Sequence, residues 1–385
     1  MPLDAIALSQ SLIRCPSVTP QDGGALGILE AALKPLGFVC KRLRFEAADT
    51  APVENLYARI GMGGPHFCFA GHTDVVPVGD AGQWTHDPFD AKIIDGTLYG
   101  RGAADMKTAI AAFAVAAERH LAKGKLKGSI SFLITGDEEG IGINGTKKML
   151  GWLSENGERI DHCIVGEPTS TVSSGDTIKI GRRGSINFRI AVRGVQGHVG
   201  YPHRALNPIP ILAVLVNRLS GEPLDNGTPH FEPSTLAFTS VDVGNDATNV
   251  IPAEATARFN IRFNDLHTPD TLKYRVEAKA KEVADEMGGE ISVSSQTSGV
   301  AFLTQPGAFT ELVSEAVAKV TGSKPEFSTS GGTSDARFIK DHCPVVELGL
   351  SGTTMHKIDE RMPVSEIHRL TDIYASVLDA YFAQK

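Results

Sequence analysis

The stretch HFCFAGHTD, residues 66–74, is an apolar run that ends in a glycine, a histidine and an aspartate. The segments SFLITGDEE and HCIVGEP repeat this arrangement, because each places an acidic residue directly after an apolar run. Short apolar runs that alternate with helical segments predict an α/β domain with a largely buried sheet. Open α/β sheets form their sites beyond the carboxyl ends of the strands, so His72, Glu138 and Glu167 are candidate functional residues.

The pattern changes after about residue 180. Between Ile186 and Val192 apolar and polar residues alternate, which indicates a strand with one buried face. The elements expected after this strand are a helix over 205–219, strands over 236–243 and 255–263, a helix over 271–287, and a strand in GGEISVSS. The order βαββαβ is typical of a ferredoxin-like domain, and helix–strand alternation then resumes.

We therefore expect an α/β catalytic domain with a central, mostly parallel sheet flanked by helices. A ferredoxin-like βαββαβ domain, which would act as a lid and dimerisation domain, interrupts it. The expected limits are 1–180 for the first catalytic part, 181–295 for the lid, and 296–385 for the second catalytic part. A chain of 385 residues has the length for two such domains.

Composition excludes several classes of protein. The net charge of -8 argues against nucleic acid as a partner, and no apolar run approaches the roughly 18 residues of a membrane span. The five cysteines are scattered without a CxxC pair, which predicts neither a zinc ribbon nor a disulfide framework and suits a reducing compartment. The start of the chain lacks the pattern of a signal peptide, so we expect a cytoplasmic protein.

Five segments carry the residues that could perform chemistry: GHTDVVPVGD, YGRGAADMKTA, ITGDEEGIG, VGEPTS and TTMHKIDE. Taken alone, each has an ordinary structural explanation. Asp74 could cap a turn or accept a hydrogen bond from the His72 imidazole. Asp105 could cap the helix that follows it or bridge two cations. Glu138 and Glu139 could form a solvated turn, or one could bind a metal while the other acts as a base.

Taken together, these segments offer two histidines and several carboxylates but no cysteine ligand. Oxygen and imidazole ligands suit zinc, manganese or cobalt. Two histidines and three carboxylates are enough for two metals that share one aspartate at a separation of about 3.5–4 Å. Burial of a carboxylate such as Glu167 costs several kcal/mol unless it is paired or bound to a metal.

In order and spacing, the motifs GHTDVVP, GRGAADMK, DEEG, GEPT and HKxDE resemble those of the two-zinc amidohydrolase/peptidase family, which includes acetylornithine deacetylase and carboxypeptidase G. The resemblance covers nearly the whole chain. It implies two zinc ions per subunit, for which cobalt or manganese can substitute. His72 and Glu167 would bind one ion, Glu139 and His356 the other, and Asp105 would bridge them.

The resemblance also implies the other catalytic roles. Glu138 would act as general base and then general acid, and Asp74 would orient His72. The lid would form a homodimer, and His198 would reach into the partner subunit's site to stabilise the oxyanion. The residues implied to contact the substrate are Arg182, Arg262, Asn249, Tyr201, Gly332 and Thr333.

Within the family, the segments RGAADMK, GRRGSINF, GVQGHVGYPH, ATNVIP, TSGGTSDARF and TTMHK resemble the members that remove a succinyl group. This implies hydrolysis of a small dianionic substrate, N-succinyl-L,L-2,6-diaminopimelate, to succinate and L,L-2,6-diaminopimelate by a zinc-activated water, in lysine and diaminopimelate biosynthesis. The alternatives are a sister two-zinc deacylase or peptidase, and a non-catalytic binding protein on the same fold. Thr108, Gly200 and Gly352 depart from the pattern of the family.

Overall fold

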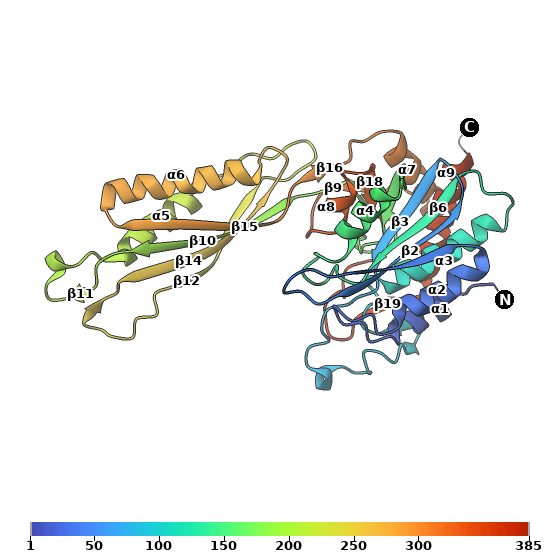
Figure 1. Cartoon of the computed structure of the whole chain (residues 1–385), viewed down its shortest axis with the longest axis horizontal. Helices are drawn as coiled ribbons and strands as arrows, with labels where there is room; N and C mark the ends of the chain where they lie inside the picture. The colour runs from blue at the N-terminus through green and yellow to red at the C-terminus, as the bar shows by residue number, and fades with distance from the viewer. Residues whose placement is uncertain (1, 384–385) are drawn as a thin grey trace. The chain divides into compact units, whose positions relative to one another are not determined.

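The computed structural model describes residues 2–383, which form two compact units (Figure 1). The first unit comprises the chain up to Ile180, the segment Thr304–Ser328, and the chain from Ser334 onward. The second unit comprises Gly181–Leu303 and Thr329–Thr333. From the sequence, we expect the lid domain to end at residue 295. The second unit extends to Leu303, because strand β16 (Phe302–Leu303) pairs with β9 (Gly181–Arg182).

An eight-stranded mixed sheet forms the centre of the first unit. Its strands, in spatial order, are β1 (Val39–Phe45), β2 (Val53–Gly61), β6 (Ser129–Thr135), β3 (His66–His72), β7 (His162–Val165), β18 (Val345–Glu347), β8 (Thr177–Lys179) and β17 (Glu326–Ser328). The four central strands β6, β3, β7 and β18 run parallel to their neighbours within this group. All seven residues of β6 are buried, as expected for a strand with both faces covered.

Helices flank this sheet, as the sequence predicted. They are α1 (Ala5–Ile13), α2 (Ala25–Leu33), α3 (Lys107–Leu121), α4 (Thr146–Glu155), α7 (Ala308–Thr321), α8 (Ala336–Ile339) and α9 (Val364–Ala383). The rings of Phe69 on β3 and Phe113 on α3 stack at 4.4 Å, and Phe69 also meets Tyr374 of α9 at 5.6 Å. Helices α3 and α9 therefore cover one face of the sheet, and the alanine-rich α3 is buried from Lys107 to Ala117.

Beside the main sheet, the first unit has a small three-stranded sheet. Its strands are β4 (Ile93–Ile94), β5 (Thr97–Tyr99) and β19 (Arg361–Pro363). Because β19 follows the TTMHKIDE segment and β5 ends at Tyr99, the first residue of YGRGAADMK, this pairing brings the two motifs together.

The second unit contains a four-stranded antiparallel sheet covered by two helices (Figure 1). In chain order its elements are β10 (Gly184–Arg193), α5 (Pro208–Gly221), β12 (Thr235–Asp242), β14 (Glu254–Phe263), α6 (Pro269–Met287) and β15 (Glu290–Gly299). This is the predicted βαββαβ order. Phe188 and Phe259 stack at 4.9 Å on the face that packs against α5 and α6, whereas Arg189 and Arg258 point to the exposed face.

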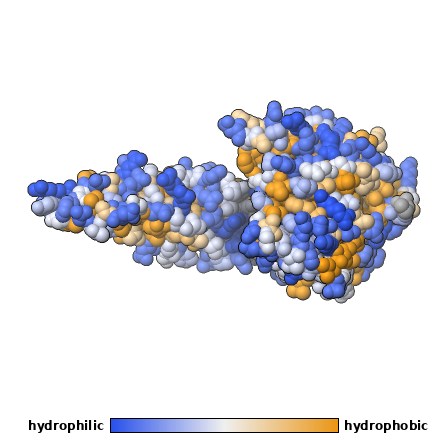
Figure 2. Space-filling view, turned by 90° about the horizontal axis from the view of Figure 1, so that it is seen from below, coloured by the Kyte–Doolittle hydropathy of each residue, from blue (hydrophilic) through white to orange (hydrophobic). Residues whose placement is uncertain are grey.

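Short strands β11 (Gly197–His198) and β13 (Val250–Ile251) pair with each other in the second unit. Figure 2 shows a mainly hydrophilic surface on this unit, with hydrophobic residues interspersed. Among residues 2–383, no helix combines the length and the apolar character that crossing a membrane requires.

Candidate metal centre and substrate contacts

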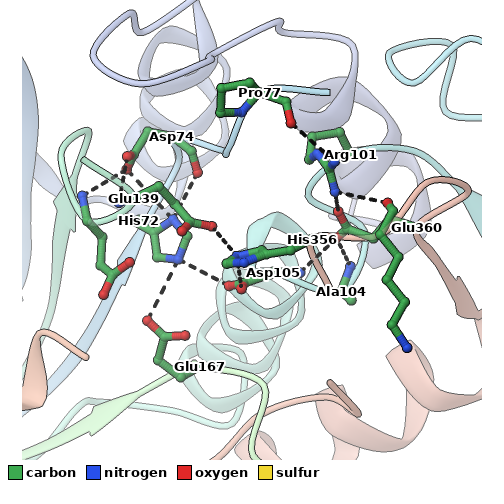
Figure 3. Close-up of polar contacts among 12 residues, drawn as sticks. His72, Asp74, Pro77, Arg101, Ala104, Asp105, Glu139, Glu167, His356 and Glu360 are labelled. Carbon is green, nitrogen blue, oxygen red and sulfur yellow. Dashed lines mark hydrogen bonds and ion pairs between the residues drawn. The ribbon is translucent and has the colours of Figure 1, made fainter. Parts of the chain in front are cut away.

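The ends of three neighbouring strands position the acidic and histidine residues of the site. His72 is the last residue of β3, Glu139 follows β6, and Glu167 follows β7. Because β6, β3 and β7 run parallel, these residues emerge at the same edge of the sheet. Figure 3 shows their side chains converging with those of Asp105 and His356, which come from loops.

Two groups of potential metal ligands share Asp105. In the first, His72 Nε2 lies 3.2 Å from Asp105 Oδ1 and 3.7 Å from Glu167 Oε1. In the second, His356 Nε2 lies 2.9 Å from Glu139 Oε1 and 3.2 Å from Asp105 Oδ2. Within each group the potential ligand atoms lie within 4.8 Å of one another. Each oxygen of the Asp105 carboxylate thus faces a different histidine (Figure 3).

Asp105 does not cap helix α3. The N-cap residue is Met106, which makes no side-chain cap hydrogen bond. The alternative that explained Asp105 as a helix cap is therefore wrong, and its buried carboxylate contacts the two histidines instead.

Asp74 lies beside His72, but its carboxylate does not accept the imidazole hydrogen bond. The acceptor for His72 Nδ1 is the backbone carbonyl of Asp74 at 2.9 Å, whereas the nearest carboxylate oxygen is 3.7 Å away. The carboxylate accepts hydrogen bonds from the backbone amides of Glu138 at 3.3 Å and Glu139 at 3.0 Å. A protonated Nδ1 leaves Nε2 of a neutral imidazole with its lone pair toward the ligand group, which is the arrangement of a metal-bound histidine.

Burial and close carboxylates perturb the pKa values of the cluster. Burial raises the pKa of Glu138 well above its usual range, and the Glu167 carboxylate raises it further. Burial likewise raises the pKa of Asp74 to about 6. Hydrogen bonds to Asp105 and Glu139 raise the pKa of His356 to about 10. For Asp105, burial opposes ionisation, yet hydrogen bonds from His356 and His72 hold its pKa well below the usual range.

Such a cluster fits divalent cations. It gathers carboxylates that repel one another in a place where burial disfavours their charge, and positive charge between them relieves both costs. Its donors are imidazole nitrogens and carboxylate oxygens, the set that zinc, manganese and cobalt accept. A carboxylate that faces both groups, as Asp105 does, is the ligand type that bridges two metals.

In the second unit, three predicted contact residues lie together at one end of the sheet. Val199, next to His198, donates its amide to the Asn249 carbonyl at 3.1 Å, and the His198 and Tyr201 rings lie 5.8 Å apart. All three predicted residues are exposed. His198 Nδ1 accepts the Gly200 amide at 3.0 Å, so a neutral His198 carries its proton on Nε2, where it can be donated.

The predicted arginines and the 332–333 segment lie at the other end of this unit. Arg182 is buried, and its Nη1 donates to the carbonyl of Ser330 at 3.3 Å, which places it near Gly332 and Thr333. Arg262, on β14, is half-buried. Burial lowers the pKa of Arg262, and the positive charge of Arg183 lowers it further. Within a single chain, these arginines and His198 therefore lie at opposite ends of the second unit.

The structure also explains two departures from the family pattern. The Thr108 hydroxyl, buried in α3, donates to the Ala103 carbonyl at 2.5 Å and so joins the start of the helix to the loop before it. A Cβ at Gly352 would lie 3.2 Å from the Met355 sulfur and 3.6 Å from Pro168 Cβ. A side chain at residue 352 would therefore have to displace the flexible end of Met355.

Sequence reasoning missed three buried charged residues beside the ligands: Arg101, Lys107 and Glu360. Lys107 donates to the Cys15 carbonyl at 2.7 Å, and burial lowers its pKa to about 8. All three stand in the motifs GRGAADMK and HKIDE, where charged residues fall among glycine, alanine and ligand positions. That unusual context is a signal for buried, paired charges, because such residues are seldom buried alone.

Known proteins of closely similar sequence cover nearly the whole chain. Succinyl-diaminopimelate desuccinylase from Rhodospirillum centenum is 60% identical over 381 residues, covering 99% of this chain and 98% of its own length. The desuccinylase of the same name from Parvibaculum lavamentivorans is 60% identical over 382 residues, covering 99% and 96%.

Solved structures show the same fold at low sequence identity. Aminopeptidase PepT from Bacillus cereus superposes with a TM-score of 0.79 at 20% identity, covering 99% of this chain and 98% of its own. The YXEP protein of Bacillus subtilis, a dinuclear metal-binding peptidase, superposes with a TM-score of 0.73 at 19% identity, covering 97% and 96%. The sequence profile of peptidase family M20/M25/M40 matches residues 68–380. The chain therefore belongs to peptidase family M20/M25/M40.

Proposed function

We propose that this protein hydrolyses N-succinyl-L,L-2,6-diaminopimelate to succinate and L,L-2,6-diaminopimelate, a step in lysine and diaminopimelate biosynthesis. The observation that carries the proposal is the pair of ligand groups that share Asp105, with Glu138 beside them. Relatives with the name succinyl-diaminopimelate desuccinylase match nearly the full length of the chain at 56–60% identity, which supports the choice of substrate.

In this proposal, His72 and Glu167 would hold one zinc ion, Glu139 and His356 would hold the other, and Asp105 would be shared by both. Cobalt or manganese could take the place of zinc, because the donor set does not distinguish them. Such ions, when bound, polarise a carbonyl group and lower the pKa of water. The backbone hydrogen bonds at Asp74 hold His72 and the 138–139 turn in position for this site.

Glu138 is the proposed general base and acid. It belongs to neither ligand group, yet it lies close enough for Glu167, His72 and Glu139 to perturb its pKa. A carboxylate whose charge is disfavoured readily accepts a proton from the attacking water. The protonated Glu138 then gives this proton to the departing amine nitrogen as the amide C–N bond breaks.

Arg182 and Arg262 are the proposed clamps for the carboxylates of the dianionic substrate, because guanidinium groups bind carboxylates in a bidentate manner. Burial lowers the pKa of Arg262, and the only other charge found to perturb it among the described residues is that of Arg183. An anionic substrate would offset the repulsion between these two arginines. Gly332 and Thr333, near Arg182, would line the same part of the site.

His198, with Tyr201 and Asn249, is proposed to act in the site of a second subunit. Along β14, Arg262 lies seven positions after Ala255, which is near the His198 end, and this is about 24 Å in an extended strand. One small substrate cannot span both ends of a single second unit. A homodimer formed through the second units would allow His198 Nε2 to donate to the oxyanion opposite the arginines of its partner.

The deciding experiment compares the turnover of three substrates on one preparation of known metal content: N-succinyl-L,L-2,6-diaminopimelate, N-acetylornithine and a dipeptide. We expect the succinyl substrate to be preferred at least tenfold in kcat/KM, about 1.4 kcal/mol of transition-state preference. Equal rates would reduce the function to that of a general deacylase or peptidase. Binding of all three without hydrolysis would point to a non-catalytic protein.

A further inference from the structure

Arg101 and Glu360 form a buried ion pair next to the ligand groups (Figure 3). Arg101 Nη1 lies 2.8 Å from Glu360 Oε2, and the two side chains are 3% and 0% exposed. A buried ion pair adds little stability over apolar residues of the same volume, because both charges lose their hydration. We therefore explain the Arg101–Glu360 pair by the neighbouring residues that it holds in position, and not by its contribution to stability.

Glu360 holds the backbone at Asp105. Its second oxygen, Oε1, accepts hydrogen bonds from the amides of Ala104 at 2.8 Å and Asp105 at 3.1 Å. The backbone position of Asp105 sets where its carboxylate lies, and this carboxylate contacts both His72 and His356. Glu360 itself lies in neither ligand group.

Arg101 connects this segment to two other loops. Its Nη1 also donates to the Lys357 carbonyl at 3.2 Å, and its Nη2 donates to the Pro77 carbonyl at 3.3 Å. Lys357 follows the ligand His356, and Pro77 follows the segment that carries His72 and Asp74. The guanidinium carbon of Arg101 lies over the Trp84 ring, 5.1 Å from its centre.

The His356 loop needs such support. His356 has φ 61° and Asp359 has φ 55°, both in the left-handed region that residues with a side chain rarely occupy. Backbone in this region persists only where the surroundings hold it. Two hydrogen bonds hold this loop at residues 357 and 360. They run from Arg101 to the Lys357 carbonyl and from the Gly100 amide to the Glu360 carbonyl at 2.9 Å.

We propose that Arg101 and Glu360 are positioning residues that set the geometry of the Asp105, Glu139 and His356 group, and thereby the metal affinity of that site. This rests on the metal-binding part of the proposed function. Loss of the pair should affect this group more than the His72 and Glu167 group. Only the former depends on the strained His356 loop, whereas His72 ends a central strand.

The test is zinc titration of the metal-free full-length protein by calorimetry with Glu360→Gln and Arg101→Lys. Glu360→Gln keeps one oxygen but removes the charge that pairs with Arg101, and Arg101→Lys keeps the charge but cannot reach all three acceptors. We expect one of the two zinc affinities to fall about ten- to hundredfold in Glu360→Gln while the other changes less, with a smaller loss in Arg101→Lys. The absorption spectrum of the cobalt-loaded protein should change, and excess zinc should restore kcat while KM stays nearly constant.

The matched control is Glu158→Gln, which breaks the ion pair of Arg59 and Glu158 in the same unit. Neither residue contacts a ligand group, so this variant should lower the melting temperature without changing zinc affinity or the cobalt spectrum. Two unchanged zinc affinities and an unchanged cobalt spectrum in Glu360→Gln and Arg101→Lys would overturn the proposal. Because both readouts concern metal binding alone, they stay decisive even if the wild-type protein hydrolyses a different amide.

Discussion

The candidate ligand cluster of the first unit and the predicted substrate-contact residues of the second unit are built in opposite ways. His72 is 1% exposed at the end of a central strand, and its neighbours are fixed by backbone hydrogen bonds. His198 and Tyr201 are exposed, in a region where the paired strands β11 and β13 are only two residues long each. Groups that bind a metal must be held rigidly before it arrives, whereas groups on an exposed loop can be brought to a substrate later.

The two regions also differ in what a substitution should cost. In the first unit a change in one charged side chain acts on a dense, buried network. In the second unit the same type of change removes one contact and leaves the remainder of the unit intact. The proposed roles can therefore be separated by kinetics, and the expected losses decrease from the centre of the ligand cluster to the substrate clamps.

The largest effect is expected for Glu138→Gln. The change keeps the shape of the side chain but removes its ability to take and return a proton, so kcat should fall about 10²–10⁴-fold. Because Glu138 lies outside both ligand groups, two zinc ions should remain bound. Stability should be equal or higher, since burial disfavours the Glu138 charge. Steady-state kinetics, metal analysis and thermal unfolding check these results, and near-normal turnover would remove Glu138 from the role of base.

The second largest effect is expected for His198→Ala, and its test requires a dimer made of two different variants. His198→Ala should lower kcat about 10²–10³-fold, the range seen when one oxyanion donor is removed. Co-expression of this variant with Glu138→Gln under two different tags, followed by purification through both tags, isolates mixed dimers. A mixed dimer has one site with Glu138 and the partner's His198 both intact, so we expect about half of the wild-type activity per dimer.

The mixed dimer decides between two arrangements. If His198 served the site of its own chain, every site in the mixed dimer would lack one of the two residues, and activity would stay at the level of the single variants. If the chains did not associate, no protein would carry both tags. The first result would contradict the proposed action of His198 in the partner's site, and the second would contradict the proposed homodimer.

Much of this architecture was predictable from the sequence because it follows from periodicity and from strand ends. The alternation in residues 186–192 predicted β10, and the apolar runs before His72 and Glu167 predicted β3 and β7. Parallel neighbours then place those residues at one edge of the sheet. The strands β9 and β16 are too short to show a periodic pattern. For this reason the sequence predicts an end of the lid domain at residue 295, whereas the second unit extends to residue 303.

Other features could not be predicted because they depend on the backbone. For Asp74 the sequence left open a turn cap or a hydrogen bond from the His72 imidazole. A backbone carbonyl makes the contact with His72, and the carboxylate accepts two backbone amides. Glu360 likewise acts on the amides of a segment more than 250 positions away in the chain. A motif shows which side chains are present, but the partner of a buried carboxylate is decided by which unpaired amides the fold brings within reach.

The smallest expected effect is that of Arg262→Gln, which has an internal control on the same strand. Arg258 lies four residues earlier on the same polar face of β14, but farther from Arg182. Arg262→Gln should lower kcat/KM for the succinyl substrate by the equivalent of about 1.5–3 kcal/mol, mostly through KM, because a hydrogen-bonded charge pair is lost. Arg258→Gln should leave both constants unchanged. Equal losses in the two variants would mean that the arginines act through the overall charge of the sheet, and a substrate clamp at Arg262 would then be excluded.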